Sequence, residues 1–324
     1  MNITVISPAA KQSRSGNGVT AVRWARILRA LGHRVHVESD GDSRETLDAD
    51  LLVAIHAWRS ASAISQFAAR HSDRPIVVLL AGTDIYRFQY THAETTLASM
   101  RIAHRLVGLH DHVADDIPAE FAEKLRIIYQ SAPPLPRPRQ PAIRHFDVCV
   151  VGHLRDEKDP FRAARAAAQL PASSRVRIIH LGKAHTEQYA QAARDEMAAN
   201  PRYVWRGEVS PGEVRRAFGR CRAMVMSSVM EGGANVVSEA IVAGLPVLAS
   251  DINGNRGLLG ARHPAYYPVE NTQGLATLLQ RAEDEPAFLQ AVQHNAATRT
   301  ALFSPDRERD AWAALLTELM ARSM

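Results

Sequence analysis

Short, continuous apolar runs recur along this chain, and each is followed within a few residues by a helical stretch. In the first half these runs lie at residues 3–6, 51–55, 76–80 and 106–109. Apolar runs without alternation are typical of strands buried on both faces, which occur in parallel sheets covered by helices. The chain is therefore expected to be an α/β protein built from parallel sheets.

The first repeat of this pattern, a strand, a loop, a helix and a second strand, lies near the N-terminus. A strand at 3–6 leads into a glycine loop at 15–18, and a helix is predicted from about Val19 to Leu31. Its apolar residues recur at the spacing of an amphipathic helix. Gly32 then stands where a left-handed C-terminal cap belongs, before a strand at 34–38. This order predicts a βαβ unit.

The composition changes abruptly near the middle of the chain. Five of the nine residues at 133–141 are proline. Because proline fixes φ and lacks a backbone donor, this segment suits neither a helix nor a central strand. We expect an N-terminal domain at 1–132, a Pro-rich linker at 133–144 and a C-terminal domain at 145–304. The helix at 305–324 is expected to pack back on the first domain.

The same alternation resumes after the linker. Strands are predicted at 146–151, 175–181, 203–206, 223–227 and 246–249, and helices at 160–170, 185–199, 211–221 and 236–243. The prediction is an α/β chain of two Rossmann-like domains. Because ligands of such sheets bind beyond the carboxyl ends of the strands, an interdomain cleft is the expected site.

Composition narrows the class of protein. Hydrophobic residues make up 46% and charged residues 23%, as in a globular protein rather than a disordered one. Two cysteines are too few for a disulfide scaffold. No apolar run approaches the ~20 residues of a membrane span, and the opening residues lack a signal-peptide pattern. The net charge of +5 is spread along the chain. We expect a cytoplasmic protein with small-molecule substrates, without nucleic-acid or stable membrane partners.

The segment from Glu231 to Glu239 is the strongest local signal. It contains Gly232 and Gly233, then Ala234 and the expected start of a helix near Asn235 and Val236. Glycines allow close approach of a ligand to the backbone, and the amides of a helix start bind anions. The two carboxylates suit sugar hydroxyls, because ionised carboxylates only accept hydrogen bonds. An ordinary turn with two solvated acids would fit the same residues.

A second signal follows the first strand of the second domain. Arg155 and Lys158 lie three residues apart in a strand-to-helix loop. Two cations there could neutralise a diphosphate, with Arg as a bidentate fork and Lys as a point charge. Local ion pairs with the neighbouring acids are the alternative.

Candidate residues of the first domain follow its strands. The glycine loop with the helix behind it could hold a small anion, and His56 could orient a substrate or handle a proton. The glycine loop could instead merely turn the chain, and His56 could be a hydrogen-bonded core histidine. Thr83 and Asp84 could form an N-cap. The candidates are Gly16, Asn17, Gly18, Thr20, Arg23, His56, Arg59, Gly82, Thr83 and Asp84. The histidine spacings offer no credible third ligand, so neither a metal nor a cofactor is expected.

Together these residues resemble the family-four glycosyltransferases of the GT-B fold. The resemblance covers essentially the whole chain and is most specific in the second domain. It implies that Glu239 holds the ribose of a nucleotide and that Glu231 faces the donor sugar. It further implies that the amides of 232–236 hold sugar and phosphate, and that Arg155 and Lys158 hold the diphosphate. The turn that contains Gly207 and Glu208 would pack on a uracil base.

Four phrases are closer to one subfamily, the selenosugar synthases of selenoneine biosynthesis. They are residues 151–161, 230–244, 82–86 and 56–60. The resemblance implies transfer of a hexose, notably N-acetylglucosamine, from a UDP-sugar to the selenium of selenophosphate, with release of UDP and phosphate. Two other functions stay open: an O-glycosyltransferase for a small-molecule or lipid hydroxyl, and a nucleotide-sugar-binding regulator without turnover.

Overall fold

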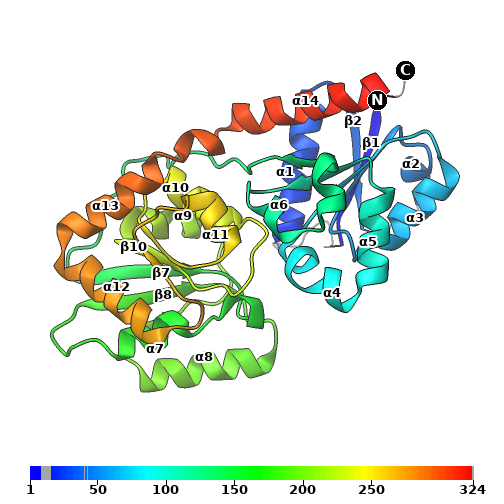
Figure 1. Ribbon diagram of the computed structural model, residues 1–324. Coiled ribbons are helices and arrows are strands. Elements are labelled where there is room, and N and C mark those ends of the chain that lie inside the picture. Colours follow the sequence, from blue (N-terminus) through cyan, green and yellow to red (C-terminus); the bar gives the residue numbers. More distant parts are fainter. Residues whose placement is uncertain (9–15, 40, 42, 323–324) are drawn as a thin grey trace. The chain divides into compact units, whose positions relative to one another are not determined.

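The computed structural model describes residues 1–8, 16–39, 41 and 43–322 of the chain. The chain divides into two compact units. The first contains Met1–Ser131, Gly232–Ala234 and Ser304–Met324, and the second contains Ala132–Glu231 and Asn235–Phe303. Figure 1 labels many of their helices and some of their strands.

The first unit is built on a parallel sheet that has six strands within the described residues, in the order β2-β1-β3-β4-β5-β6. The strands are β1 (Asn2–Ile6), β2 (Arg34–Glu38), β3 (Leu51–Ile55), β4 (Ile76–Leu79), β5 (Arg105–Gly108) and β6 (Leu125–Ile127). The connecting elements are α1 (Gly16–Ala30), α2 (Arg44–Leu47), α3 (Ala61–Arg70), the π-helix η1 (Asp84–Phe88), α4 (Gln89–Thr91), α5 (Ala93–Ile102), α6 (Val113–Asp116) and the 3-10 helix η2 (Ala119–Lys124).

Alternate residues of the same strands supply two separate cores, one on each face of this sheet. Val53 of β3 packs with Trp24 of α1 and with Trp312 of α14 (Pro305–Arg322). Leu52 and its neighbours pack with α3 and α5 on the other face. Strands covered on both faces must be apolar throughout, which is why their sequence shows no alternation.

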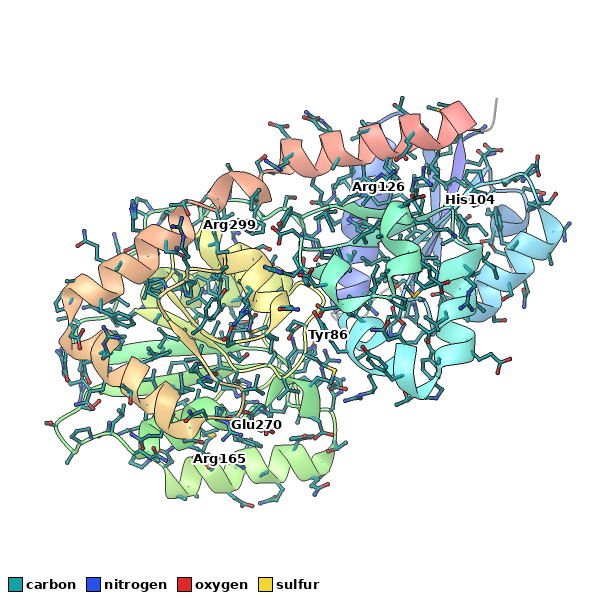
Figure 2. The ribbon with its side chains drawn as sticks, in the orientation of Figure 1. Tyr86, His104, Arg126, Arg165, Glu270 and Arg299 are labelled. Atoms are coloured by element: carbon teal, nitrogen blue, oxygen red, sulfur yellow. The ribbon has the colours of Figure 1, made fainter. Side chains whose placement is uncertain are left out.

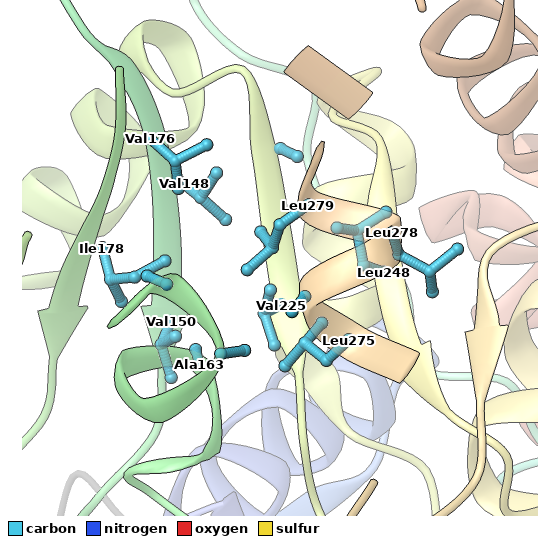
Figure 3. Close-up of a cluster of buried hydrophobic side chains, with 14 of the residues drawn as sticks. Val148, Val150, Ala163, Val176, Ile178, Val225, Leu248, Leu275, Leu278 and Leu279 are labelled. Carbon is cyan, nitrogen blue, oxygen red and sulfur yellow. The ribbon is translucent and has the colours of Figure 1, made fainter. Parts of the chain in front are cut away.

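The second unit repeats this plan with the described strand order β12-β11-β10-β7-β8-β9, all parallel. The strands are β7 (Phe146–Val151), β8 (Val176–Leu181), β9 (Tyr203–Trp205), β10 (Ala223–Met226), β11 (Val247–Ser250) and β12 (Tyr266–Tyr267). The helices are η3 (Asp156–Lys158), α7 (Arg162–Ala168), α8 (Glu187–Ala199), α9 (Pro211–Arg220), α10 (Asn235–Val242), α11 (Asn253–Leu259), α12 (Thr272–Asp284), α13 (Pro286–Ala297) and η4 (Thr300–Phe303). Figure 3 shows Val148, Val225 and Leu279 in its core.

These two parallel sheets with helices on their faces confirm the predicted α/β class. Gly32 and Gly244 both have φ in the left-handed region, as expected for residues that end helices. The prediction was wrong at the start of α1, which begins at Gly16 rather than near Val19. The Thr20 hydroxyl donates to the Gly16 carbonyl at 2.9 Å, within the first helical turn. Ser15, the other end of the predicted loop, lies outside the described residues.

The proline-rich segment at 133–145 is described throughout and forms neither helix nor strand. It belongs to the second unit, where the guanidinium of Arg139 donates to the carbonyls of Phe218, Gly244 and Cys221. Prolines cannot donate from their backbone, so an arginine side chain provides much of the attachment. Its role as a linker stays a prediction. None of the described helices is long and apolar enough to cross a bilayer.

Helix α14 belongs to the first unit, although the sequence of the second unit precedes it. It packs on α1, where Trp24 and Trp312 meet edge to face with ring centroids 4.8 Å apart. Buried Glu308 accepts from the Trp24 indole at 3.0 Å and from the Ser131 amide at 2.8 Å. Buried polar groups are stable only with such partners.

Glu318 ties the far end of α14 to the sheet edge. It accepts hydrogen bonds from Nε of Arg105 and Nε of Arg126, each at 2.9 Å; Arg126 is labelled in Figure 2. The hydrogen bonds from Arg126, and then those from Arg105, lower the pKa of Glu318 from 4.5 to about 2. Arg105 is almost fully buried, so Glu318 also supplies its counter-charge.

We expect Glu318→Gln to lower the free energy of unfolding by about 2 kcal/mol at pH 7, because two charge-assisted bonds weaken and a buried guanidinium loses its counter-charge. The folded-state pKa is depressed, so this stabilisation is present above pH 4.5 and is lost as the pH falls towards 2. Urea unfolding of both proteins between pH 2 and pH 7 measures it. A wild-type advantage that does not shrink in acid would contradict the assignment, and Glu187→Gln, on an exposed surface pair, serves as the control.

Candidate functional site

Lys158 and Glu231 form an ion pair beyond the carboxyl ends of neighbouring strands β7 and β10. Nζ of Lys158 contacts Oε1 of Glu231, and the side chains are only 16% and 11% exposed. The Ser228 hydroxyl donates to the same carboxylate oxygen at 2.6 Å. The two residues stand 73 positions apart in the sequence and meet because β7 and β10 are adjacent in the sheet. The site thus holds a cation and an acceptor-only anion side by side.

Backbone contacts fix the carboxylate side of this pair. The Ser250 hydroxyl donates to the Ser228 carbonyl at 2.6 Å, and Nδ2 of Asn255 donates to the Ser250 carbonyl at 2.9 Å. Gly254 lies so close that a Cβ atom there would stand 2.1 Å from the carbonyl oxygen of Glu231. Both Ser250 and Asn255 are fully buried, so these contacts hold the backbone around Glu231 in place.

Hydrogen bonds also fix the loop after β7, which contains Lys158. The Ser227 hydroxyl lies 3.0 Å from the carbonyl oxygens of both Lys158 and Asp159. The Val229 amide donates to the Glu157 carbonyl at 3.0 Å. Asp159 has a φ of 43°, an uncommon value for a residue other than glycine, and it ends the short helix η3. The loop after β7 is therefore tied to the loop after β10.

Arg155 lies apart from this ion pair. Its side chain is 40% exposed, and its Nε atom is 3.8 Å from Oε2 of Glu157. This agrees in part with the alternative of local ion pairs in this loop. The guanidinium stays near the protein surface, where an anionic ligand can reach it. The predicted pairing of Arg155 and Lys158 on one diphosphate stays a prediction.

A second group of residues follows β8 and β9. The Trp205 indole donates to the Gly182 carbonyl at 2.7 Å, and the Gly182 amide donates to the Gly207 carbonyl at 2.8 Å. Gly207 has a φ of 67°, which glycine adopts without strain. This pairing gives the turn before Glu208 a defined backbone.

His153 lies in the loop after β7, and burial together with nearby charges shifts its pKa. Burial lowers its pKa most, and the neighbouring His185 and Arg155 lower it further, while Glu208 opposes them. Nδ1 of His153 accepts the Lys183 amide at 3.1 Å, which assigns the proton of the neutral ring to Nε2. The lowered pKa keeps the ring of His153 neutral at pH 7.

Helix α10 begins at Asn235, as the sequence predicted. Glu231 precedes this helix and Glu239 lies inside it, so the two carboxylates bracket its first turns. Glu239 and Val236 are half-buried, and Ala234 is buried. The roles of Gly232, Gly233 and their neighbours in ligand binding stay predictions.

In the first unit, His56 and Asp84 form a buried dyad beyond β3 and β4. Nδ1 of His56 lies 2.6 Å from Oδ1 of Asp84, and Nε2 lies 2.9 Å from the Thr83 hydroxyl. His56 has a φ of 81°, a strained conformation for a histidine. Strained backbone held by such contacts is common at functional sites, which makes His56 the leading candidate of this unit.

Asp84 accepts hydrogen bonds from three backbone amides and also contacts His56. The donors are the amides of Ala57 at 2.8 Å, Trp58 at 3.0 Å and Ala81 at 3.0 Å. With four partners in the described chain, Asp84 orients His56 and joins the loops after β3 and β4. Its expected contact with an acceptor stays a prediction, and Gly82 and Thr83 form the helical residues just before η1.

Arg59 is exposed beside an aromatic cluster that sequence reasoning missed. Its guanidinium carbon lies 5.9 Å from the centre of the Trp58 ring. Trp58 in turn packs on Phe88 with centroids 4.3 Å apart, and Phe88 closes the π-helix η1. Such helices are frequent at functional sites. The signal in the sequence was the pair of aromatic residues that follow β3 and β4.

The expected anion site at the start of α1 has a different environment. Gly16, Asn17 and Gly18 form the first turn of this helix. Thr20 is buried, donates to Gly16 and accepts from Nε2 of Gln130 at 2.7 Å. Arg23 donates to the Ser131 carbonyl at 2.5 Å and lies 3.9 Å from Glu308. These side chains therefore already have partners inside the first unit.

Metal binding has no candidate among the described residues, where no three His, Cys, Asp or Glu side chains gather closely enough. In the second unit, sequence reasoning also missed Ser228, Ser250 and Asn255. Ser228 followed a predicted strand directly, which was a usable signal. Ser250 and Asn255 act through backbone contacts that no spacing reveals.

Comparison with known proteins identifies the class. Residues 138–299 match the family model described as glycosyl transferases group 1. Anabaena HepE in complex with UDP and glucose is 16% identical, with a TM-score of 0.79 over 98% of this chain and 100% of that one. Sucrose-phosphate synthase from Thermosynechococcus elongatus is 15% identical, with a TM-score of 0.80 over 99% of both chains. None of the curated proteins matches the chain by sequence.

The fold is therefore that of the GT-B glycosyltransferases, as predicted. The family match spans half of the sequence and includes Lys158, Glu231 and Glu239. The chain belongs to the glycosyl transferases group 1.

We expect Gly254→Ala to destabilise the second unit by about 1–3 kcal/mol, because its Cβ would collide with the Glu231 backbone. Gly219→Ala is the matched control, since a Cβ there meets nothing within 4 Å. Replacing a helical glycine by alanine should leave stability unchanged or raise it by up to about 1 kcal/mol. Chemical unfolding measures both. Equal stability of Gly254→Ala and wild type would show that Glu231 is not held in this manner.

Proposed function

We propose that the protein transfers a hexose from a UDP-sugar, with the donor bound at the carboxyl edge of the second unit's sheet. Membership of the glycosyl transferases group 1 supports the reaction class. The structures of HepE with UDP and with UDP-glucose support UDP as the nucleotide. The observation that carries the proposal is the partly buried contact of Lys158 with Glu231, just before the helix that starts at Asn235.

The ion pair suggests how the donor binds. Lys158 is the cation that would turn to the diphosphate of the donor, together with Arg155. Glu231 keeps the Ser228 hydroxyl as a partner and offers its other oxygen to the sugar hydroxyls. As UDP departs, negative charge grows on its phosphate, and fixed cations together with the amides of residues 232–236 stabilise it.

The remaining donor contacts follow from the family resemblance. Glu239 would hold the ribose hydroxyls, and Gly207 and Glu208 would lie along the uracil. The defined turn that Gly182 and Trp205 give to this segment supports a flat base-binding surface. No metal or other cofactor is proposed.

For the acceptor we propose selenophosphate, and for the sugar N-acetylglucosamine. The phrases at 56–60 and 82–86, which carry the resemblance to selenosugar synthases, contain the His56–Asp84 dyad. Selenium would attack the anomeric carbon as the bond to UDP breaks. Water would then cleave the phosphorus–selenium bond, which leaves a 1-seleno sugar and phosphate.

Selenium is a soft and strong nucleophile, so the acceptor needs little help from a base. Positioning then matters more than proton removal. His56 is held by Asp84 and Thr83, and the exposed Arg59 offers a charge for an anionic acceptor. We assign His56 and Arg59 to orientation of the acceptor and sugar.

Incubation with UDP-N-acetylglucosamine, with and without selenophosphate, tests the proposal by UDP release and by the mass of the product. Release only with selenophosphate, together with a seleno-sugar mass, supports it. Release with a sugar, lipid or metabolite hydroxyl would identify an O-glycosyltransferase. Binding of the donor without release under any condition would identify a nucleotide-sugar-binding regulator.

We expect Lys158→Ala and Glu239→Ala each to lower kcat/KM for the donor by about 10²–10³-fold, because each removes a fixed contact to the departing nucleotide. Arg194→Ala, which removes one member of an exposed pair on α8, is the control and should keep wild-type turnover. Steady-state assays over a range of donor concentrations measure the effect. Near-normal kcat/KM in both site variants would reject the donor site.

A further inference from the structure

The ammonium of Lys158 already has an anionic partner in the second unit, because Nζ of Lys158 contacts Oε1 of Glu231. Both side chains are mostly covered by the protein, so solvent screens this pair less than a pair on an open surface. An ammonium carries a single positive charge and cannot neutralise a carboxylate and a diphosphate together. A diphosphate that binds Lys158 must therefore compete with Glu231.

The backbone contacts around the pair restrict how this competition is resolved. The Ser227 hydroxyl lies 3.0 Å from the Lys158 carbonyl oxygen, which holds the lysine backbone. A Cβ atom on Gly152 would stand 3.7 Å from Cδ of Lys158, so the lysine stem lies along Gly152. The close approach of Gly254 holds the Glu231 backbone. Only the end of the lysine side chain is then left to change partners.

Ser228 cannot replace the lysine as a counter-charge. Its buried hydroxyl donates to Oε1 of Glu231 at 2.6 Å, but a hydroxyl is neutral. When Lys158 turns to a phosphate, Glu231 stays ionised in a mostly covered position without its cation, which is costly. Hydroxyls of a hexose donate hydrogen bonds to a carboxylate and offset this cost. Free UDP has no hexose, and its ribose is assigned to Glu239.

We propose that Glu231 and the diphosphate compete for Lys158, and that the hexose hydroxyls compensate Glu231, so that the site binds UDP-hexose in preference to free UDP. This inference rests on the proposed donor site. Glu231 thereby acts as a specificity residue against the product nucleotide. After transfer of the hexose, the competition favours the return of Lys158 to Glu231 and the departure of UDP.

Glu231→Gln tests the proposal, because glutamine keeps the shape of the side chain and removes its charge. We expect this variant to bind free UDP about tenfold more tightly than wild type, since a partly buried pair is stronger than a surface pair and weaker than a buried one. Binding of UDP-N-acetylglucosamine and of UDP-glucose should not tighten. Calorimetry with the three ligands measures the preference for donor over UDP, which should fall about tenfold or more.

Ser228→Ala should act in the opposite direction. Without the hydroxyl, Glu231 depends on Lys158 alone, so a diphosphate that draws the lysine away costs more. We expect UDP to bind about threefold or more weakly to this variant, although Ser228 has no proposed contact with UDP. This second variant decides the question where Glu231→Gln does not fold.

Glu283→Gln is the matched control. Its carboxylate pairs with Arg175, just before β8 and so at the amino edge of the same sheet, and is only 7% exposed. The variant removes the same charge from the same unit, far from the proposed donor. Its affinity for UDP should equal that of wild type, and thermal unfolding checks that each variant is folded.

The outcomes separate this inference from the proposed function. Wild type that binds UDP and a UDP-hexose, together with a Glu231→Gln variant that binds UDP no more tightly, would refute the competition alone. An equal gain for UDP and for the UDP-hexoses would also refute it, as would a Ser228→Ala variant with unchanged affinity for UDP. Failure of wild type to bind any of the three ligands would reject the donor site as well.

Discussion

Both faces of a parallel sheet must be covered by helices, and this constraint shapes both units of the protein. In the first unit, Val53 and its alternate neighbours need an apolar cover that α1 provides only in part. Helix α14 completes it with Trp312 and three leucines. Helix α14 also carries two carboxylates, Glu308 and Glu318, which pair with groups that would otherwise be buried without partners.

Carboxylates that accept several hydrogen bonds also occur at the candidate sites. Asp84 accepts three backbone hydrogen bonds and contacts His56, while Glu231 accepts from Lys158 and Ser228. Asp84 and Glu231 differ in how many of their oxygen atoms the protein itself engages. Asp84 has both oxygens engaged by the chain, which suits a positioning residue. Lys158 and Ser228 both contact Oε1 of Glu231, and Oε2 is the oxygen that we assign to the donor sugar in the proposed function.

Much of the fold could be predicted from the sequence because parallel strands that are buried on both faces appear as short, continuous apolar runs. The strands at 34–38, 51–55 and 146–151 have the predicted bounds. Short, half-buried β6 and the two-residue β12 carry too little pattern to be recognised, and α12 and α13 were not assigned. The candidate site was predictable only in its parts. Spacing indicated Lys158 and Glu231 separately, but their contact depends on the strand order.

The place of α14 in the first unit has a consequence for synthesis. The ribosome makes residues 1–131 well before α14, yet the core that they form lacks the cover of α14 until residues 305–322 have been made. Domains usually fold in order as the chain emerges. Here the sequence of the second unit is synthesised before α14, so the sheet of the first unit stays partly uncovered until α14 has been made.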